Sequence, residues 1–506
     1  MTAPPLPAGF GVRLDPWTMR REGGVLLGGT PFQIVRLSPA HLSLVDSWQA
    51  GSLVGEDDGG LARALVAAGL AQPVPPSSPA AAGLVQPVSP SSQAAGVLAS
   101  PALHSAGARP AVSVVVPVKD RPVALARLLR AIRDCAATDP VHEIIVVDDG
   151  SADPGAHASV AEAAGARLVR RPVCGRAAAA RNDGAAAASG EVLAFIDSDC
   201  VPRPGWLAVL LPHFADPLVA AVAPRIVAHG TRSPGWLGAY ESARSPLDRG
   251  PLPGRVVPGG RVPFVPTAAL LVRAAAFGEG FDTRLVGGED VDFVWRLTAG
   301  GAHVRYEPGG EVAHEHRTTF REFVARRVYY GRTAAPLARR HPGAARPLAV
   351  SPWTAAAWAA VALRRPLLGA AITGVATGLL AHDLRGVLPD PADDAITLAG
   401  GGTLRAGEVV ADAAVRAWWP LAVAAFVGVP RLRPAIAAAA VVPALLEWRR
   451  ERPPLGPLQW LAARRLDDAA YGWGVWTGSL DEGLFDALRP DLGWHLRIID
   501  SDELFG

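Results

Sequence analysis

Pairs of carboxylates follow two strand-like apolar runs in the middle of the chain. Asp148 and Asp149 come after the run EIIVV, and Asp197 and Asp199 come after the run VLAFI. Because successive side chains of a strand alternate between faces, an Asp-x-Asp at its end presents both carboxylates on one side. A divalent cation, Mg²⁺ or Mn²⁺, held by these carboxylates and by diphosphate oxygens would neutralise the like charges. The alternative is a solvated turn that each Asp merely shapes.

Two further groups of residues suit proton transfer and metal binding. Glu289 and Asp290 precede the helix-like stretch VDFVWRL. We predict that Asp290, with Glu289 in reserve, is the general base that removes a proton from an acceptor hydroxyl; both acids could instead only complement the helix dipole. His314 follows an apparent strand, and its imidazole could bind the cation beside Asp199. His316 competes for this role, and a structural histidine is the other alternative.

The elements that must position these residues alternate between strands and helices. Strand-like runs at residues 112–118, 142–147 and 192–196 are separated by helix-like runs at residues 123–132 and 177–188. This order is typical of an α/β fold, a mostly parallel sheet with helices on its faces. Ligands of such sheets bind beyond the carboxyl ends of the strands. We therefore expect the acidic pairs to meet at one edge of the sheet.

The composition limits the classes of function. The formal net charge is only +2 and Lys119 is the single lysine, which argues against a nucleic-acid partner. The cysteines Cys135, Cys174 and Cys200 form no CxxC pair, so a zinc site or disulfide framework is not expected. The first residues contain Arg13 but no apolar signal-peptide core. We therefore expect a cytoplasmic protein.

The catalytic chemistry is expected within residues 111–340, and the region before it differs in texture. Residues 1–72 show the pattern of a small α+β module, with Ser38 as a helix cap. The module is either a winged-helix-like packing domain or a peptide-recognition domain. The tandem repeat AGLAQPVPPSSPAA and AGLVQPVSPSSQAA marks residues 73–110 as a linker rich in Pro, Ser and Ala.

The C-terminal region, residues 341–506, contains apolar segments interrupted by arginines. Two pairs of segments flank basic turns, one at Arg364 and Arg365 and the other at Arg431 and Arg433. Each segment is shorter than the roughly 20 residues of a membrane-spanning helix. We expect two helical hairpins. They either dip into the cytoplasmic face of a membrane, with arginines at its anionic surface, or form a helical cap.

The motifs, in their order, resemble the family-2 glycosyltransferases of GT-A fold. The resemblance covers residues 111–331 and rests on VSVVVPVKDRP, EIIVVDDGSAD, ARNDGAAAASGEVLAFIDSDCVPRPGWL, GGEDVDFVWRL and VAHEHR. It implies an inverting sugar transfer from a nucleoside-diphosphate sugar with the help of a divalent cation. It also implies a role for each candidate residue: Pro117, Asp148 and Asp149 line the nucleotide pocket, Asp197 and Asp199 serve the ribose and metal, His314 contacts the metal or diphosphate, Arg176 and Arg181 approach the diphosphate, and Asp290 is the base. Arg181 could equally form a buried structural ion pair.

Flanking stretches resemble a narrower family, the actinobacterial glycosyltransferases of mycofactocin biosynthesis. They are PFQIVRLSPAHLSLVD, RRVYYGRTAAPLARRHPG and DDAAYGWGVWTGSL. The resemblance implies that glucose is added in β-1,4 linkage to a peptide-derived redox cofactor. The donor to test is UDP-glucose. The QxxRW motif of processive synthases is absent. Two other interpretations remain open: a cell-envelope glycosyltransferase with a lipid or polysaccharide acceptor, and a sugar-nucleotide-binding scaffold without activity.

Overall fold

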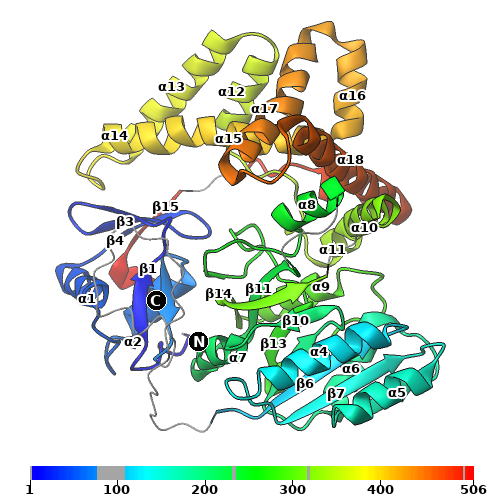
Figure 1. Ribbon diagram of the computed structural model, residues 1–506. Coiled ribbons are helices and arrows are strands. Elements are labelled where there is room, and N and C mark those ends of the chain that lie inside the picture. Colours follow the sequence, from blue (N-terminus) through cyan, green and yellow to red (C-terminus); the bar gives the residue numbers. More distant parts are fainter. Residues whose placement is uncertain (1–2, 77–108, 231–234, 316–318, 494–495, 506) are drawn as a thin grey trace.

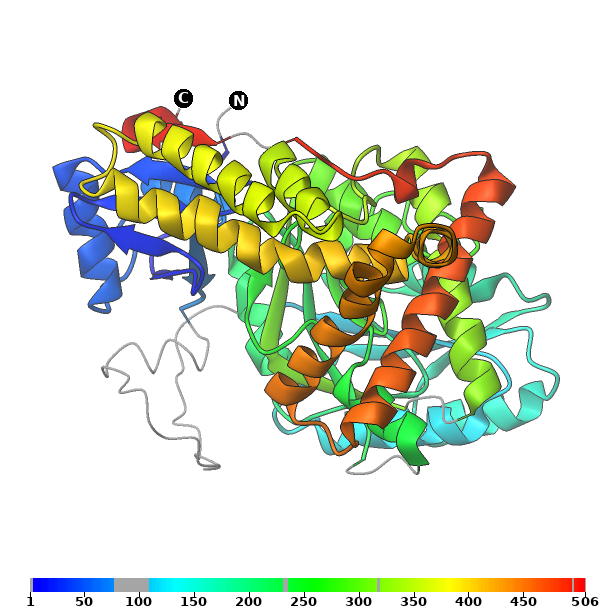
Figure 2. The same ribbon diagram turned by 90° about the horizontal axis from the view of Figure 1, so that it is seen from above.

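The computed structural model describes residues 3–76, 109–230, 235–315, 319–493 and 496–505, which form three parts (Figure 1). A small N-terminal module lies beside a domain built on a large sheet. A helical C-terminal region extends over both, as the view from above shows (Figure 2). The C-terminal part of the chain thus connects the other two.

The N-terminal module has its own core around Trp48 and Leu65. Its elements are β1 (Gly11–Leu14), β2 (Met19–Arg21), β3 (Val25–Gly28), β4 (Gln33–Arg36), α1 (Pro39–Gln49), α2 (Gly59–Ala67) and β5 (Ala71–Val74). Helix α1 begins as expected, because the Ser38 hydroxyl accepts a hydrogen bond from the backbone of His41. Strand β5 pairs with β1 and lies within the first copy of the sequence repeat. Residues 77–108 of the expected linker lie outside the described residues.

The last strand of the chain joins this module. Strand β15 (Arg497–Asp500) pairs in parallel with β4, so the sheet order is β15-β4-β3-β2. An exposed ion pair between Arg36 and Asp500, 2.7 Å long, accompanies the pairing. The backbone N–H of Ser38 also donates to the hydroxyl of Ser501, 463 residues further along the chain. The two ends of the described chain therefore fold as one unit.

A single sheet forms the centre of the second part. The strand order is β10-β14-β11-β13-β9-β6-β7-β8, with β12 paired to β14. Strands β9, β6, β7 and β8 run parallel, as do β11 and β14, whereas β13 lies antiparallel between β9 and β11. The bounds are β6 (Val112–Val118), β7 (Glu143–Asp149), β8 (Arg167–Arg171), β9 (Val192–Ile196), β10 (Cys200–Pro202), β11 (Val219–Ala228), β12 (Gly254–Arg255), β13 (Ala269–Arg273) and β14 (His303–His314). The predicted α/β class is confirmed.

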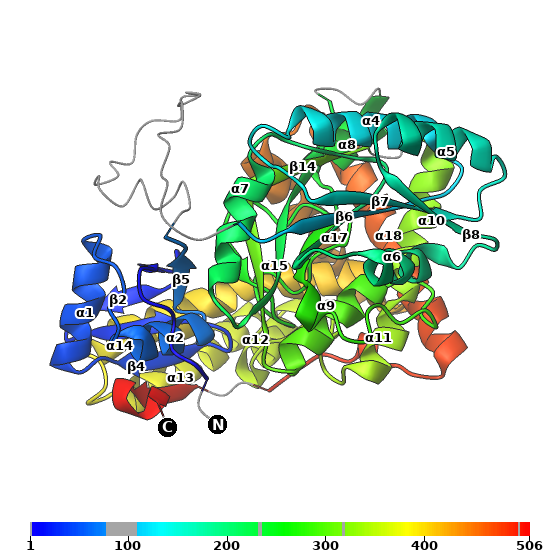
Figure 3. The same cartoon turned by 90° about the horizontal axis from the view of Figure 1, so that it is seen from below.

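Helices cover both faces of this sheet (Figure 3). Helices α4 (Pro122–Asp134), α5 (Pro154–Ala163) and α7 (Trp206–Leu210) lie on one face, and α6 (Arg176–Ala187) and α9 (Glu289–Ala299) lie on the other. The side chains of β6 alternate between the two cores, with Val114 and Val116 towards α4 and Val115 towards α6. Helix α6 lies very close to the sheet, because a Cβ at Gly184 would collide with Val115.

Two ion pairs, one of them buried, fix the N-terminal module to this sheet. Arg63 of α2 donates to both carboxylate oxygens of Asp216, at 2.6 and 2.8 Å, and both side chains are buried. Arg261 contacts Asp15 at 2.9 Å. Removing one partner of a buried ion pair leaves an uncompensated charge and is strongly destabilising. The module is therefore a fixed part of the fold.

The third part consists of helices, including the two expected hairpins. They are α8 (Gly235–Ala243), α10 (Phe320–Arg332), α11 (Ala334–Arg340), α12 (Pro352–Ala362), α13 (Pro366–Asp383), α14 (Pro391–Ala395), α15 (Gly401–Arg416), α16 (Trp419–Gly428), α17 (Arg433–Glu451) and α18 (Pro457–Glu482). The hairpins α12–α13 and α16–α17 stand side by side at the top of Figure 1, and α12 contacts α17. The C-terminal end of α13 packs on the N-terminal sheet through Leu380 and Leu384.

Glycines allow α10 and α18 to approach each other backbone to backbone. A Cβ at Gly331 of α10 would collide with the carbonyl oxygen of Tyr471. In α18, a Cβ at Gly474 would collide with the carbonyl of Val328, and one at Gly478 would press on Arg332. The stretches RRVYYGR and YGWGVWTGSL thus meet in one helix-helix interface.

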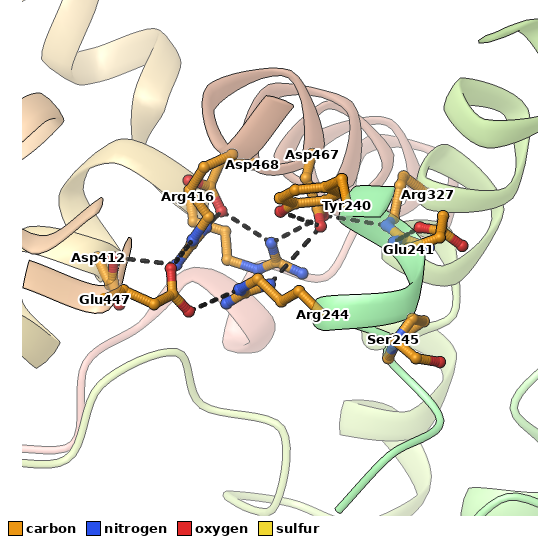
Figure 4. A network of polar contacts seen from close by, with 12 residues as sticks. Tyr240, Glu241, Arg244, Ser245, Arg327, Asp412, Arg416, Glu447, Asp467 and Asp468 are labelled. Atoms are coloured by element: carbon orange, nitrogen blue, oxygen red, sulfur yellow. Dashed lines mark hydrogen bonds and ion pairs between the residues drawn. The ribbon is translucent and has the colours of Figure 1, made fainter. Parts of the chain in front are cut away.

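Charged side chains are buried where this interface meets α8, α15 and α17 (Figure 4). The Asp467 carboxylate accepts hydrogen bonds from the Tyr240 hydroxyl at 3.0 Å and from Arg416 at 3.2 Å, and it pairs with Arg327 at 3.1 Å. Asp468 accepts a hydrogen bond from Arg416 at 2.8 Å. These arginines hold the pKa of Asp467 well below its usual range, despite its burial. We call this cluster the buried charge network.

Candidate active site

Three parallel strands bring the predicted acids to one edge of the sheet. Strands β9, β6 and β7 are neighbours, so their carboxyl ends lie together. Pro117, near the end of β6, pairs with Val147, and Asp149 ends β7. Asp197 follows β9 directly. This is the edge at which ligands of such sheets bind.

The two acids that end β7 have different surroundings. Asp148 is fully buried, and its Oδ1 accepts the backbone N–H of Ser151 at 3.0 Å. It therefore shapes the turn, which is the role that the alternative interpretation of this motif gave it. Asp149 Oδ1 accepts from the backbone N–H of Gly175 at 2.8 Å and from Arg171 at 2.9 Å. Asp149 thus organises the loop that leads into α6.

Arg181 joins two of the acidic motifs. This residue of α6 donates to Asp197 at 2.7 Å and to Glu289 at 3.2 Å, and only 4% of its side chain is exposed. Like charges that would repel each other are therefore held on a shared cation. Of the two roles considered for Arg181, the interior position fits the structural ion pair. Arg176, at the start of the same helix, is exposed with a φ of 69°.

Asp199 and His314 also lie together. Strand β10 pairs with β14 so that Cys200 lies opposite His314, and this register brings His314 Nε2 within 3.5 Å of Asp199 Oδ1. The other oxygen of Asp199 accepts a hydrogen bond from Arg121 at 2.6 Å. His316, the competing candidate, lies outside the described residues. The motifs DSD and VAH are therefore neighbours in space.

This donor set fits a divalent cation that also binds a substrate. Asp199 and His314 provide an oxygen and a nitrogen that can reach the same ion. Within the described part of the chain, no group of three or more His, Cys, Asp or Glu side chains is arranged to hold a metal. Mg²⁺ and Mn²⁺ at nucleotide sites take one or two protein ligands, and diphosphate oxygens and water complete their shells. Two protein ligands are thus sufficient for such a site.

Asp290 has the properties of a general base. It lies in the first turn of α9, and its Oδ1 accepts the backbone N–H of Val291 at 2.8 Å. Burial, followed by the adjacent charge of Glu289, raises the pKa of Asp290 to about 6. Glu289 is instead engaged by Arg181. A carboxylate with a pKa near neutrality is suited to taking a proton from a hydroxyl.

Helices α10 and α11 hold the loop that carries this base. Gly287 and Gly288 have φ values of 92° and 74°, a conformation that other residues rarely adopt. A Cβ at Gly287 would collide with the hydroxyl of Tyr329, and one at Gly288 would press on Thr333 and Leu337. The loop therefore runs directly beneath Tyr329, whose side chain remains 38% exposed.

Sequence reasoning missed the basic residues that pair with these acids. Arg121, in the motif VKDRP, contacts Asp199, and Arg171, at the end of β8, contacts Asp149. Lys119 interacts with the thiol of Cys174, which raises the pKa of the lysine. Their position in the sequence could have identified them, because each lies at or just after the carboxyl end of a strand.

Comparisons with known proteins identify the family of the chain. Residues 113–279 match the model of the family described as Glycosyl transferase family 2. The chain is similar to a Mycobacterium tuberculosis protein named "Pre-mycofactocin glycosyltransferase", with 37% identity over 517 aligned positions that cover 97% of this chain and all of that protein. It is 35% identical over 130 residues to human "Polypeptide N-acetylgalactosaminyltransferase 15", covering 24% of this chain and 20% of that protein.

A solved structure of a mannosyltransferase from Pyrobaculum calidifontis, in complex with GDP-Man and Mn²⁺, is also similar. The identity is 19%, the alignment covers 71% of this chain and 87% of that one, and the TM-score is 0.36.

Proposed function

The chain belongs to the family-2 glycosyltransferases, in the family of the pre-mycofactocin glycosyltransferase, and we propose that it transfers glucose from UDP-glucose to premycofactocin. It is thus a glycosyltransferase of mycofactocin biosynthesis. The transfer inverts the anomeric carbon and forms β-1,4 linkages on this peptide-derived redox cofactor. The observation that carries the proposal is the bridge from Asp197 through Arg181 to Glu289, the chain neighbour of the proposed base Asp290.

The donor binds at the carboxyl ends of β6, β7 and β9. Pro117 and Asp149 lie where the nucleotide is expected, and Asp197, which is 31% exposed, can accept hydrogen bonds from the ribose. Arg176 is exposed at the N-terminus of α6, where helix dipole and guanidinium both favour a diphosphate. Arg181 and Asp148 support this surface from inside.

A divalent cation, Mg²⁺ or Mn²⁺, would be held by Asp199 and His314. When bound, the cation neutralises the charge that develops on the departing diphosphate. Arg121, which donates a hydrogen bond to Asp199, is positioned to keep the carboxylate oriented and to contribute positive charge at the same position. The remaining roles belong to side chains of the protein.

Transfer proceeds by direct displacement. The acceptor hydroxyl oxygen forms a bond to the anomeric carbon while the bond from that carbon to the diphosphate oxygen breaks. The nucleoside diphosphate leaves with the electron pair, and the hydroxyl proton passes to Asp290. Attack opposite the leaving group inverts the anomeric configuration, so one base is sufficient and no covalent intermediate forms. The raised pKa of Asp290 favours its role as proton acceptor.

The acceptor separates this proposal from its main alternative. A cell-envelope glycosyltransferase would use a lipid or polysaccharide acceptor, and the apolar hairpins would hold it beside that substrate. Both enzymes would work at the cytoplasmic face of the cell membrane, where we also place this one. The N-terminal module is fixed to the catalytic sheet by Arg63 and Asp216, and in this proposal it is the part that contacts a peptide-derived acceptor.

The test is an acceptor screen with the purified full chain. UDP-glucose, Mg²⁺ or Mn²⁺ and premycofactocin are incubated together, and hexose additions are measured by mass spectrometry. We expect hexose addition by the wild type and none above background by Asp290→Asn. Transfer to a lipid but not to premycofactocin would establish the alternative. Donor binding without turnover on any acceptor would indicate a scaffold.

A further inference from the structure

The turns of the two C-terminal hairpins are exposed and apolar. Residues 363–368, LRRPLL, comprise the turn after α12 and the start of α13. Residues 426–431, FVGVPR, comprise the end of α16 and the turn before α17. Every residue in both stretches is exposed. Leu367 is 86% exposed and Val427 is 68% exposed. Both turns lie at the top of Figure 1, on the side of α15 away from the catalytic sheet. We call them the hairpin tips.

The C-terminal region reverses the usual distribution of polarity. Acids and arginines of the buried charge network lie inside it, where α8, α10, α15 and α18 meet (Figure 4). Large apolar side chains lie outside. The large apolar residues of the hairpins that are more than half exposed are Leu363, Leu367, Val375, Leu421, Val423 and Val427. Exposed apolar side chains gathered in one region mark a site of contact with another apolar phase or partner.

The charges at the tips identify the partner. Each turn combines its apolar residues with arginines: Arg364 and Arg365 in one, and Arg431 in the other, followed by Arg433. Residues 352–382 and 419–446 contain no Asp or Glu at all. A surface that is both apolar and uniformly basic fits the interface of a bilayer with anionic headgroups. It does not fit a second copy of this chain in a symmetric contact, because such contact would place like charges opposite each other.

The dimensions favour contact with one leaflet. Among the described residues, no single helix is long and apolar enough to cross a membrane. One pair of helices, Pro391–Arg416 and Trp419–Gly428, is long and apolar enough when taken together, but the two helices are bent by 88° relative to each other. Helix α12, with 11 residues, is about 16 Å long at 1.5 Å per residue. Half of a hydrocarbon core is about 15 Å. Because the shorter helix of each hairpin, α12 or α16, limits how deeply the tip can insert, the hairpins reach one leaflet at most.

We propose that the two hairpin tips form a membrane-docking surface that binds an anionic bilayer, with apolar side chains inserted among the lipids and arginines at the headgroups. This inference deepens the membrane location proposed above and rests on it, but it does not depend on the donor or the acceptor. Arg433 donates hydrogen bonds to the carbonyls of Phe426 and Val427 and so also caps α16. The docking arginines are accordingly Arg364, Arg365 and Arg431.

The experiment is flotation of the full chain with vesicles of phosphatidylcholine alone or mixed with phosphatidylglycerol. One variant combines Leu367→Glu, Leu368→Glu and Val427→Glu; another combines Arg364→Gln, Arg365→Gln and Arg431→Gln. Leu53→Glu and Arg130→Gln, at exposed positions outside the C-terminal region, are matched controls. We expect binding to the anionic vesicles and at least about tenfold weaker binding in either tip variant, with wild-type binding in the controls. Added salt should weaken the binding.

Three results would overturn the proposal. They are no flotation of the wild type, equal flotation of the tip variants, and a wild-type dimer that the tip substitutions dissociate without any vesicle binding. Circular dichroism of each variant checks that exposed substitutions leave the helices folded. Transfer to a water-soluble acceptor without vesicles is measured in parallel and should be unchanged in the tip variants. If the wild type does not transfer hexose to this acceptor, the result counts against the catalytic proposal and not against the docking surface.

Discussion

The pair α10–α18 and the two hairpins use the same residue types in opposite ways. Gly474 of α18 lies in an interface where a Cβ would collide with a backbone carbonyl, whereas a Cβ at Gly378 of α13 would meet nothing within 4 Å. Asp467 of α18 is buried among arginines, whereas Asp383 at the end of α13 is exposed. In this protein, the role of a glycine or an aspartate therefore depends on which segment the fold packs against it.

The two regions should also differ in their coupling to catalysis. Helix α10 contacts α18 through Gly331 and covers the base loop through Tyr329. Changes in the α10–α18 interface should therefore affect stability and transfer together. The hairpin tips contact neither the base loop nor the acids after β9, so changes there should leave both unchanged in solution.

The largest effect is expected at the base itself. Asp290→Asn should lower kcat by about 10²–10⁴-fold, because the acceptor hydroxyl loses its proton acceptor. Leu367→Glu, in a hairpin tip, should retain wild-type kcat with a water-soluble acceptor. Release of nucleoside diphosphate during transfer measures both. An equal decrease of kcat in the two variants would show that the two regions do not differ in their coupling to catalysis.

A stability measurement on Asp290→Asn separates a catalytic from a structural role. Because the folded pKa of Asp290 is raised, its ionisation opposes folding at neutral pH, and that cost is relieved as the pH falls through the folded pKa. The uncharged Asn should therefore unfold at an equal or higher temperature than the wild type at pH 7. Thermal unfolding checks this. A less stable and less active variant would point to a structural role instead.

The next largest effect is expected in the buried charge network. Asp467→Asn should lower the free energy of unfolding by about 3–5 kcal/mol, because it leaves buried arginines without their counter-charge. Asp383→Asn is the matched substitution on a hairpin and should change it by less than about 0.5 kcal/mol. Chemical denaturation compares the two. Similar values for both would mean that the network contributes little to folding.

Glycine substitutions test the same contrast on a smaller scale. Gly474→Ala should destabilise by roughly 1–3 kcal/mol, because the added methyl group forces α10 and α18 apart. Gly378→Ala should instead stabilise by up to about 1 kcal/mol, because alanine is the better helix former and the space is open. Melting temperatures give the sign of each change. Two changes of the same sign would refute the difference in packing.

The smallest expected effect is a pH dependence of transfer. Asp290 must be ionised to accept a proton, so kcat/KM should fall about tenfold per unit as the pH drops below about 6. Vesicle docking depends on arginines, which stay charged, and should not follow this profile. Rates and flotation measured across the same pH range show whether the two activities titrate separately. An acid limb near pH 4 would mean that the base has an unshifted pKa.

Much of the catalytic sheet could be predicted from local pattern. The strands expected at residues 112–118 and 192–196 match β6 and β9 residue for residue. Ser38 caps α1 as its side chain allows. The four hairpin helices also lie close to their expected positions. These features depend on apolar periodicity and on capping, which act over a few residues.

Other features could not be predicted in this way. Strand β13 inserts antiparallel between β9 and β11, and β15 pairs with β4 from the opposite end of the chain. Asp148 and Asp149 are adjacent and chemically identical, yet one only shapes a turn and the other orders the loop before α6. Long-range pairing decides these cases, and local sequence does not identify the partner.

Local sequence was enough to predict which acids follow the strands, because strand length and alternation depend on neighbouring residues. Packing of the whole chain was needed to join Asp197 to Glu289 through Arg181 and to bring Arg121 and His314 to Asp199. It alone also decided that the glycines of α18 are buried while the leucines of the hairpins face outwards. The physical reason is that charge pairing and burial depend on distances between segments, and these are fixed only when the whole chain packs.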